Sequence, residues 1–423
     1  MGNGYIMDKM IVKKSPALRG EVTVSGSKNS ALPILFSTLL ADGDHYFENI
    51  PRLIDIDSTA LLLGSLGAEL SWKQNKVKVS VKPAKEFEAN YDVVRKMRAS
   101  ILCLGPLLTR YGEANVSMPG GCAIGTRPIN LHLEGLKEMG AEIKTEKGYV
   151  IGKCKRLHGA TILFDSPTVG GTENIMMAAS LAEGVTIIEN AAKEPEIVDL
   201  ANYLNAMGAK IDGAGSSIVR IEGVDSLSPA EHRVIPDRIE AGTLLMAGAI
   251  TGGEILVKNC VIDHIEALLV KLEESGFTIT REGTQVGVQS PPSWRGVDVT
   301  TAPFPAFATD LQAQFMAVMT QAEGTSVITE SIFENRFMHV QELVRLGANI
   351  TPKTRVTVVR GTPGKIEGAP VMATDLRASA CLILVGLVAS GETTISRIYH
   401  LDRGYENLEE KLSSLGALVH RVK

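Results

Sequence analysis

Residues 200–212 read LANYLNAMGAKID, a stretch with helical spacing of its apolar residues that ends in Met-Gly-Ala and runs into a short alternating strand. Five other stretches follow the same plan, and the glycines of successive copies lie 68–73 residues apart. One apolar stretch ending in glycine is common, whereas six ordered copies at one spacing indicate an internal repeat. The glycines are Gly67, Gly140, Gly208, Gly276, Gly347 and Gly416.

A second pattern precedes each copy: a more apolar helix, a glycine turn and a strand. Residues 175–190, IMMAASLAEGVTIIEN, are one example. Glycine accepts the left-handed conformation that often ends a helix, and the strand after it alternates apolar and polar residues. The two patterns together predict six α/β repeats of about 70 residues. In each repeat we expect the more apolar helix to be interior and the Lys- and Glu-bearing helix to be more exposed.

The length and the charge of the chain limit its architecture and its partners. A chain of 423 residues is too long for one ordinary core, which favours two globular, soluble domains of three repeats each. The net charge of −5 provides no general field for nucleic acid or an anionic membrane, so neither is an expected partner. The most apolar window, ACLILVGLVAS (380–390), is shorter than a bilayer span and predicts a buried helix.

The start of the chain and its cysteines indicate a cytoplasmic protein. MGNGYIMDKM, at residues 1–10, lacks the long apolar region of a signal peptide. The five cysteines are odd in number and scattered, which fits a reducing compartment and argues against a disulfide framework or a zinc site.

The stretch PGGCAIGTRP (119–128) departs from the repeat and carries a thiol among glycines. The glycines predict a mobile loop, and Arg127 is a cation that would lower the pKa of the Cys122 thiol when the loop closes. A lid that brings a reactive group onto a bound anion explains these residues jointly. The alternative is a spare surface thiol on a disordered loop.

A second departure is VSGSKNSALPILF (24–36), where a glycine turn meets a helix at Lys28 and Asn29. Such a junction presents backbone N–H groups and the positive end of a helix dipole to an anion. Ordinary capping of the helix by these polar residues explains the pattern equally well.

Charged residues also recur where successive repeats pass from strand to helix. Several arginines and a lysine in one cleft would suit a substrate with phosphate and carboxylate groups. Unrelated surface ion pairs are the alternative, and a helix-start Asp is most often an N-cap. Arg98 heads an apolar helix, where a structural role is open. The residues are Arg98, Asp310, Arg336, Asp375, Arg377 and Arg403.

These motifs resemble the enolpyruvyl transferases, in the branch that acts on UDP-N-acetylglucosamine. The resemblance runs nearly end to end. A sister branch, 5-enolpyruvylshikimate-3-phosphate synthase, shares the six-repeat architecture but lacks the PGGC and FENRFMH stretches. The matching stretches are SGSKNSALPIL (25–35), PGGCAIGTRP (119–128), TVGGTENIM (168–176), IIENAAKEPEIVDLA (187–201), PDRIEAGT (236–243), TDLQAQF (309–315), FENRFMHV (333–340), ATDLRASA (373–380) and RIYHLDRGYE (397–406).

The resemblance implies a two-domain inside-out α/β barrel of six βαβαββ repeats, three in each domain, with the active site in the interdomain cleft. The first domain is expected to be residues 28–235. The second is expected to combine residues 236–423 with the N-terminal strand, 1–27.

The resemblance also implies roles for individual residues. Cys122 is expected to protonate the methylene carbon of phosphoenolpyruvate and can form a covalent adduct with it. Asp310 is expected to act as, or to assist, the base that takes the proton from the sugar 3-hydroxyl. Lys28 and Asn29 are expected to meet phosphoenolpyruvate and the sugar. Arg98, Arg127 and Arg403 are expected to bind phosphates or the carboxylate. The expected nucleotide-sugar contacts are Arg127, Pro128, Ile129, Asn130, Leu131, Ser166, Pro167, Thr168, Val169, Ile332 and Phe333, with Arg336, Asp375 and Arg377 lining the cleft.

The implied reaction transfers the enolpyruvyl group to the 3-hydroxyl of UDP-N-acetylglucosamine with release of phosphate, an early step of peptidoglycan synthesis. Addition needs an acid on one face, a base at the hydroxyl and cations around a dianion. It requires no metal or organic cofactor. Fosfomycin, an epoxide that alkylates thiols, is an expected inhibitor at Cys122.

Two departures from the family pattern concern the nucleotide. Asn130 stands where many members have Asp, and Ser166 where some have Lys. Two other functions stay open from the sequence: an enzyme of the same fold with another acceptor, such as shikimate 3-phosphate, and a non-catalytic sensor of nucleotide sugars.

Overall fold

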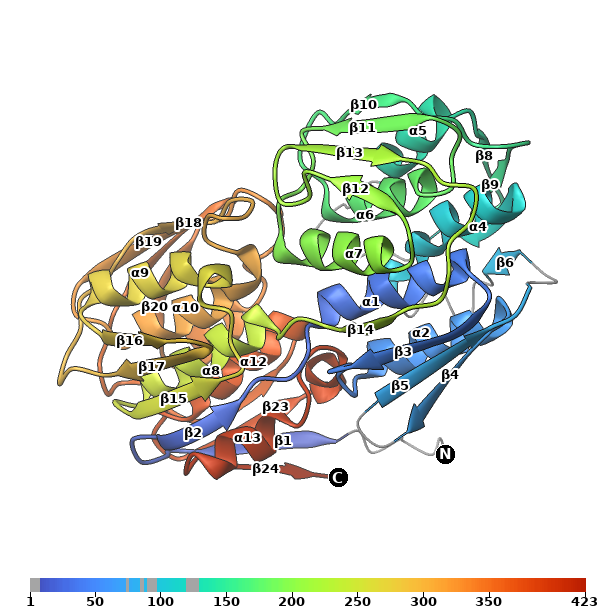
Figure 1. Ribbon diagram of the computed structural model, residues 1–423. Coiled ribbons are helices and arrows are strands. Elements are labelled where there is room, and N and C mark those ends of the chain that lie inside the picture. Colours follow the sequence, from blue (N-terminus) through green and yellow to red (C-terminus); the bar gives the residue numbers. More distant parts are fainter. Residues whose placement is uncertain (1–7, 74–75, 84–86, 90–96, 119–128) are drawn as a thin grey trace, which may run out of the picture. The chain divides into compact units, whose positions relative to one another are not determined.

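The computed structural model describes residues 8–73, 76–83, 87–89, 97–118 and 129–423. These residues form two compact units, each with its own hydrophobic core (Figure 1). Unit 1 contains residues 8–25 and 236–423, and unit 2 contains the described residues between 26 and 235. Within the described part, the chain passes between the units at Ser25–Gly26 and at Ile235–Pro236.

The described strands form six four-stranded sheets that share one pairing pattern. In one of them, β10 (Thr161–Leu163) runs parallel to β11 (Val185–Glu189), which is antiparallel to β13 (Ile218–Glu222). β12 (Lys210–Asp212) completes the sheet as the antiparallel neighbour of β13. A helix lies between β10 and β11 and another between β11 and β12, so the order of elements is βαβαββ, as expected.

The other sheets follow this pattern, each beginning with its parallel edge strand. In unit 2 they are β14 (Glu231–Arg233), β3 (Gly43–Glu48), β5 (Lys76–Val81) and β4 (Ala68–Lys73), then β6 (Glu88–Ala89), β7 (Glu113–Ser117), β9 (Tyr149–Lys153) and β8 (Glu142–Glu146). Unit 1 has three sheets. The first contains β2 (Arg19–Thr23), β15 (Glu254–Lys258), β17 (Gln285–Gln289) and β16 (Thr278–Glu282), and the second contains β18 (Val299–Thr300), β19 (Thr325–Thr329), β21 (Val356–Arg360) and β20 (Asn349–Pro352). The third contains β22 (Pro370–Met372), β23 (Glu392–Ser396), β1 (Lys9–Lys13) and β24 (Leu418–Val422).

The start of the chain completes two sheets of unit 1. β1 lies between β23 and β24 and is antiparallel to both, with Met10 opposite Ile395 and Arg421. β2 adds a parallel strand to β15. In unit 2, β14 does the same for β3, although the two strands are far apart in the sequence. In each unit, at least one sheet is therefore completed by a strand from a distant part of the sequence.

Each repeat has one buried helix and one partly exposed helix, which confirms the predicted burial. Most residues of the inner helices are buried, whereas the outer helices bury one side. Five of the outer helices expose charged residues, and the exception is the helix Pro195–Ala206, whose Glu196 and Asp199 are both buried. The inner helices are α1 (Lys28–Ser37), α4 (Leu104–Tyr111), α6 (Val169–Ala179), α8 (Arg238–Ile250), α10 (Gln312–Met319) and α12 (Leu376–Gly386). The outer helices are α2 (Ile54–Ser65), α5 (Asn130–Glu138), α7 (Pro195–Ala206), α9 (Glu266–Ser275), α11 (Val340–Arg345) and α13 (Leu408–Ser414).

The inner helices form the centre of each unit. In unit 1, α8, α10 and α12 pack against one another, with the strands outside them (Figure 1). The described strands stay in separate four-stranded sheets and do not join into a closed, hydrogen-bonded barrel. The predicted buried helix over 380–390 corresponds to α12, of which Arg377–Gly386 are buried. Among the described residues, no helix combines the length and the apolar character that a membrane span requires.

The six repeat glycines share one backbone conformation. Their φ angles lie between 89° and 114°, in the left-handed region. The glycines of the second pattern, predicted to end the inner helices, also have positive φ, from 70° to 119°: Gly43, Gly112, Gly184, Gly252, Gly324 and Gly391. Gly112 directly follows α4 and Gly252 comes just after α8, whereas the other four lie further along, at or directly before the start of the next strand. A side chain is strained in this conformation, which explains why glycine recurs at both places in every repeat.

Another repeated glycine is needed for space rather than for its φ angle. A Cβ atom at Gly223 would lie 1.8 Å from the carbonyl oxygen of Ala182, and one at Gly361 would lie 1.8 Å from that of Ala322. Gly223→Ala is therefore expected to lower the free energy of unfolding by about 1–3 kcal/mol, measured by denaturant titration. Gly64→Ala is the control, because a Cβ there meets no atom within 4 Å, and it is expected to be neutral or stabilising. Equal destabilisation by the two variants would contradict the packing argument.

Candidate active site

In unit 1, two buried arginines form hydrogen bonds with one carboxylate. Asp310 lies in the 3-10 helix η4 (Thr309–Leu311), directly before α10. Its Oδ1 accepts a hydrogen bond from Arg336 Nη2 at 2.8 Å, and its Oδ2 accepts one from Arg377 Nη2 at 2.6 Å. The arginine side chains are 4% and 5% exposed, whereas that of Asp310 is 26% exposed. The carboxylate is thus the part of this cluster that solvent or a ligand reaches.

This geometry decides two alternatives that the sequence left open. Asp310 is not the N-cap of α10: its oxygens bind arginines, and Leu311 at the cap position makes no side-chain capping bond. Arg336 and Arg377 are not unrelated surface pairs, because both are buried and share one partner. Burial by itself raises the pKa of the Asp310 carboxyl, but Arg377 and Arg336 outweigh it and hold that pKa well below its usual value.

Polar residues inside the core hold the Asp310 segment in place. The Gln314 side chain donates to the backbone oxygen of Asp310 at 3.0 Å and to the Tyr405 hydroxyl at 3.0 Å. Tyr405 also bonds Thr243 Oγ1 at 2.9 Å, and its ring lies 5.5 Å from the Arg377 guanidinium. The sequence analysis missed Gln314 and Tyr405, although a fully buried Gln four residues after Asp310 in an apolar helix is a recognisable feature.

Glu330 connects the predicted sugar contacts to the Asp310 segment. It is 1% exposed, and its Oε1 accepts the backbone N–H groups of Ile332 at 2.9 Å and Phe333 at 3.1 Å. Its Oε2 accepts the hydroxyl of Thr309 at 2.8 Å. The turn that carries Ile332 and Phe333 is therefore fixed relative to Asp310. The sequence analysis also missed Glu330, because it lies at the end of a strand and outside the recognised motifs.

The remaining predicted residues of unit 1 lie on neighbouring elements. Asp375 caps α12: its Oδ1 accepts the backbone N–H groups of Arg377 at 2.8 Å and Ala378 at 3.1 Å. Arg403 ends the 3-10 helix η5 (Ile398–Arg403), which packs against α12. Asp375 thus stabilises the first turn of α12, which contains Arg377.

In unit 2, Lys28 and Asn29 are the first two residues of α1, as the sequence predicted. Ser27 provides the cap, because its side chain accepts the backbone N–H of Ser30. Lys28 Nζ lies 3.5 Å from Asp55 Oδ2, and their side chains are 13% and 4% exposed. Lys28 is therefore a largely buried cation with a buried counter-charge rather than the capping residue.

The predicted nucleotide contacts lie at the starts of two adjacent helices. Thr168 caps α6, with its Oγ1 accepting the Gly171 N–H at 3.2 Å. His132, in the first turn of α5, hydrogen bonds Asn174 of α6 at 3.1 Å, and its ring would lie 3.1 Å from a Cβ atom placed on Gly170. The start of α5 is thereby held beside that of α6. The predicted contacts on these two starts are Ile129, Asn130, Leu131, Ser166, Pro167, Thr168 and Val169.

Three predicted residues, Cys122, Arg127 and Pro128, lie outside the described residues. Arg98 is the first residue of the 3-10 helix η2 (Arg98–Cys103), which leads into α4, so the predicted apolar helix begins with 3-10 geometry.

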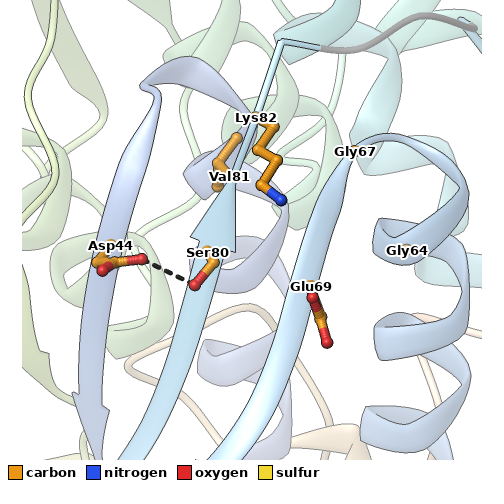
Figure 2. A pocket seen from close by; sticks show the side chains of 7 residues that line it. All are labelled: Asp44, Gly64, Gly67, Glu69, Ser80, Val81 and Lys82. Atoms are coloured by element: carbon orange, nitrogen blue, oxygen red, sulfur yellow. Dashed lines mark hydrogen bonds between the residues drawn. The ribbon is translucent and has the colours of Figure 1, made fainter.

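A surface pocket in unit 2 is separate from these groups of residues. It is lined by residues of β3, β4, β5 and α2 with their adjoining turns, and Asp44 accepts a hydrogen bond from Ser80 there (Figure 2). None of its lining residues is a predicted site residue. They are Asp44, Gly64, Gly67, Glu69, Ser80, Val81 and Lys82.

The comparison with protein families gives a match over nearly the whole chain. The model described as EPSP synthase (3-phosphoshikimate 1-carboxyvinyltransferase) matches residues 12–412. The chain belongs to this family. The two-unit fold of six α/β repeats and the arginine-bound Asp310 are thus features of a member of the EPSP synthase family.

Relatives within the EPSP synthase family are similar over their full lengths. A protein of Bdellovibrio bacteriovorus, named UDP-N-acetylglucosamine 1-carboxyvinyltransferase, is 64% identical over 98% of this chain and 100% of its own. A protein of Myxococcus xanthus with the same name is 56% identical over 99% of this chain and 100% of its own.

Solved structures of enolpyruvyl transferases have the same fold. The enolpyruvyl transferase NikO from Streptomyces tendae aligns with a TM-score of 0.87 and 25% identity, covering 98% of this chain and 99% of its own. EPSP synthase from Acinetobacter baumannii aligns with a TM-score of 0.78 at 18% identity, covering 99% of this chain and 100% of its own, which supports the fold alone.

Proposed function

We propose that this chain transfers the enolpyruvyl group of phosphoenolpyruvate to the 3-hydroxyl of UDP-N-acetylglucosamine and releases phosphate. The observation that carries the proposal is the 64% identity, over 98% of the chain, to a protein named for this transfer. The Asp310 cluster supports it, because a carboxylate held by two buried arginines suits a reaction between a hydroxyl and an anionic ester.

The reaction proceeds by addition and elimination. The sugar 3-hydroxyl oxygen bonds to C2 of phosphoenolpyruvate, its proton passes to a base, and C3 receives a proton to become a methyl group. The resulting tetrahedral intermediate then loses a proton from that methyl carbon, and the bond from C2 to the phosphate oxygen breaks. No atom is oxidised or reduced in either step.

Residues of unit 1 bind the sugar and accept the proton of its 3-hydroxyl. Asp310 orients the 3-hydroxyl and takes its proton, and Arg336 and Arg377 hold the carboxylate in place. The Ile332–Phe333 turn contacts the sugar. Its connection to Asp310 through Glu330 supports this role, because both parts of the acceptor site then keep a fixed spacing.

Residues of unit 2 bind the anionic groups. Lys28 and Asn29 contact phosphoenolpyruvate and the sugar, and the burial of Lys28 beside Asp55 supports a fixed cation at that place. The paired starts of α5 and α6 hold the uridine diphosphate. The positive end of a helix dipole favours negative charge at a helix start, which supports this role.

The loop 119–128 supplies the proton for carbon. Cys122 protonates C3 of phosphoenolpyruvate and takes the proton back in the elimination step. Arg127, Arg98 and Arg403 bind the phosphate or the carboxylate. Fosfomycin inhibits by alkylating Cys122. We place the reaction in the cytoplasm, as the first committed step of peptidoglycan synthesis.

The choice of acceptor is the experiment that tests the proposal. Phosphate release from phosphoenolpyruvate is measured with UDP-N-acetylglucosamine and, in parallel, with shikimate 3-phosphate. We expect release with the nucleotide sugar only. Release with shikimate 3-phosphate alone would overturn the proposal in favour of the sister activity, and tight binding of the nucleotide sugar without release would overturn it in favour of a sensor.

A further inference from the structure

A buried carboxylate of unit 1 holds the residue at which the chain leaves that unit. Glu240, in the first turn of α8, is 2% exposed. Its Oε2 accepts the backbone N–H of Ser25 at 2.7 Å, and its Oε1 accepts Lys411 Nζ at 2.5 Å. Lys411 also donates to Ser25 Oγ at 2.6 Å, and that hydroxyl donates to Glu406 at 2.6 Å. Ser25 is therefore fixed through both its backbone and its side chain.

A second buried carboxylate, in unit 2, holds the residue five positions further along. Asp199 of α7 is 3% exposed, and its Oδ2 accepts the hydroxyl of Ser30 in the first turn of α1. The same oxygen accepts the backbone N–H of Ile235 at 3.2 Å, and Oδ1 bonds His232 Nε2 at 2.8 Å. Asp199 thus joins the start of α1 to the segment at which the chain leaves unit 2, at Ile235–Pro236.

The backbone between these two anchors is closely packed and hydrogen bonded. A Cβ atom at Gly26 would lie 1.6 Å from the carbonyl oxygen of Asn49. The Ser27 N–H donates to the Ile235 oxygen at 2.8 Å, and the Asp237 N–H donates to the Ser25 oxygen at 2.9 Å. The segment 25–30 is consequently held at its start, its middle and its end.

We propose that Glu240 and Asp199 are positioning residues for Lys28 and Asn29. Both of these substrate-binding residues lie within the segment 25–30, and the two carboxylates hold its ends from helices of different units. Neither carboxylate needs to touch a substrate. Their effect passes through the backbone of a short, tightly packed segment, which sets where the Lys28 ammonium group points. This rests on the proposed function only in assigning Lys28 and Asn29 to substrate binding.

Conservative and radical substitutions distinguish positioning from general stability. Glu240→Ala and Asp199→Ala remove the acceptors, whereas Glu240→Gln and Asp199→Asn keep an oxygen for Ser25 and Ile235. Burial raises the pKa of the Glu240 carboxyl to about 7 while Lys411 opposes the shift, so a neutral amide is a close substitute. Turnover is measured with whichever acceptor supports phosphate release, so a wrong choice of acceptor does not affect this test.

Two readouts are needed. Hydrogen exchange of the Ser25 and Ile235 amides, resolved by mass spectrometry, is expected to accelerate about tenfold or more in the alanine variants, since each amide loses its acceptor. The kcat/KM for phosphoenolpyruvate is expected to fall by about 10–100-fold, as for a catalytic group displaced by about 1 Å. The Gln and Asn variants are expected to restore most of both values.

Matched controls lose the same kind of bond elsewhere. Asp298 accepts the Val327 N–H at 2.7 Å in unit 1, and Asn205 accepts the Ile211 N–H at 2.9 Å in unit 2. Asp298→Ala and Asn205→Ala are expected to accelerate exchange at those amides and leave kcat/KM unchanged.

Three results would overturn the proposal: unchanged exchange at Ser25 and Ile235, faster exchange with unchanged kcat/KM, or an equal loss of kcat/KM in the controls. If an alanine variant does not fold, a substitution of a hydrogen-bond donor takes its place. Lys411→Met removes one donor to Glu240, and Ser30→Ala removes one donor to Asp199. Both are expected to lower kcat/KM, and an unchanged value would equally overturn the proposal.

Discussion

Asp310→Asn is expected to lower kcat by about 10²–10⁴-fold while leaving the affinity for UDP-N-acetylglucosamine nearly unchanged. The asparagine keeps an oxygen that can accept from one arginine, so the local geometry is largely retained. It removes the charge that attracts the proton of the sugar hydroxyl. Initial rates of phosphate release and calorimetric titration with the nucleotide sugar measure the two quantities separately.

Glu273→Gln is the control for Asp310→Asn, because it also breaks a carboxylate–arginine bond in unit 1, with Arg281, but does so on the surface. Its rate is expected to equal that of the unmodified protein. If Asp310→Asn lowered affinity and rate by equal factors, Asp310 would be a structural residue and not a base.

The same variant tests the electrostatics of the site through its stability. Arg377 and Arg336 lower the pKa of Asp310 in the folded protein, so the folded state favours the ionised form. This stabilisation is fully present above the ordinary pKa of an aspartate and is lost as the pH falls towards the lowered folded-state value. The melting temperature of Asp310→Asn is therefore expected to lie below that of the unmodified protein at neutral pH, and the difference is expected to shrink on acidification.

A low pKa makes a carboxylate a weak base, which bears on the mechanism. Asp310 shares its charge with two arginines and therefore attracts a hydroxyl proton only weakly. The negative charge of a substrate bound beside the exposed edge of this carboxylate would raise the pKa of Asp310. The arrangement therefore favours a base that gains strength when the site is filled.

The repeat architecture could be predicted from the sequence because glycine marks a backbone requirement. The positive φ at Gly208 and at its five counterparts is a local property, and a local pattern reveals it. The partner of β1 could not be predicted in this way. Alternation in residues 9–13 fixes which side chains face the core, but it does not say that β23 and β24 are the neighbours.

The site shows the same division between local and distant information. The start of α1 at Lys28 follows from the glycine turn and Ser27, which are adjacent in the sequence. The role of Asp310 depends on Arg336 and Arg377, which are 26 and 67 residues away. A helix-start Asp looks the same whether it caps the helix or binds two arginines, so only the fold distinguishes the two.

Cys122→Ala is expected to lower turnover by about 10²–10⁴-fold and to abolish labelling by fosfomycin. Protonation of carbon is the demanding part of the addition step, and an alanine has no proton to give. Cys122→Ser is expected to lose most turnover as well, because a hydroxyl of ordinary pKa is a far weaker acid than a thiol. Rates of phosphate release and the intact mass after incubation with fosfomycin measure the two effects.

The other four cysteines make the labelling experiment specific. Cys103, Cys154, Cys260 and Cys381 are free thiols, and all except the partly buried Cys154 are buried. Burial raises the pKa of Cys103 and of Cys260 to about 12, and it raises those of Cys154 and Cys381 as well. Thiols with such raised pKa values hold few thiolates at neutral pH and react slowly with an epoxide.

Cys154→Ala is therefore the matched control for Cys122→Ala, since Cys154 is the most accessible of the four. It is expected to keep full turnover and to carry one fosfomycin adduct after incubation, as the unmodified protein does. Incubation of the unmodified protein with phosphoenolpyruvate, followed by peptide mapping, is expected to place any added mass on the peptide that contains Cys122. Full activity of Cys122→Ala would remove the thiol from the mechanism, and the proton for C3 would then have to come from one of the cations around the phosphate, such as Lys28.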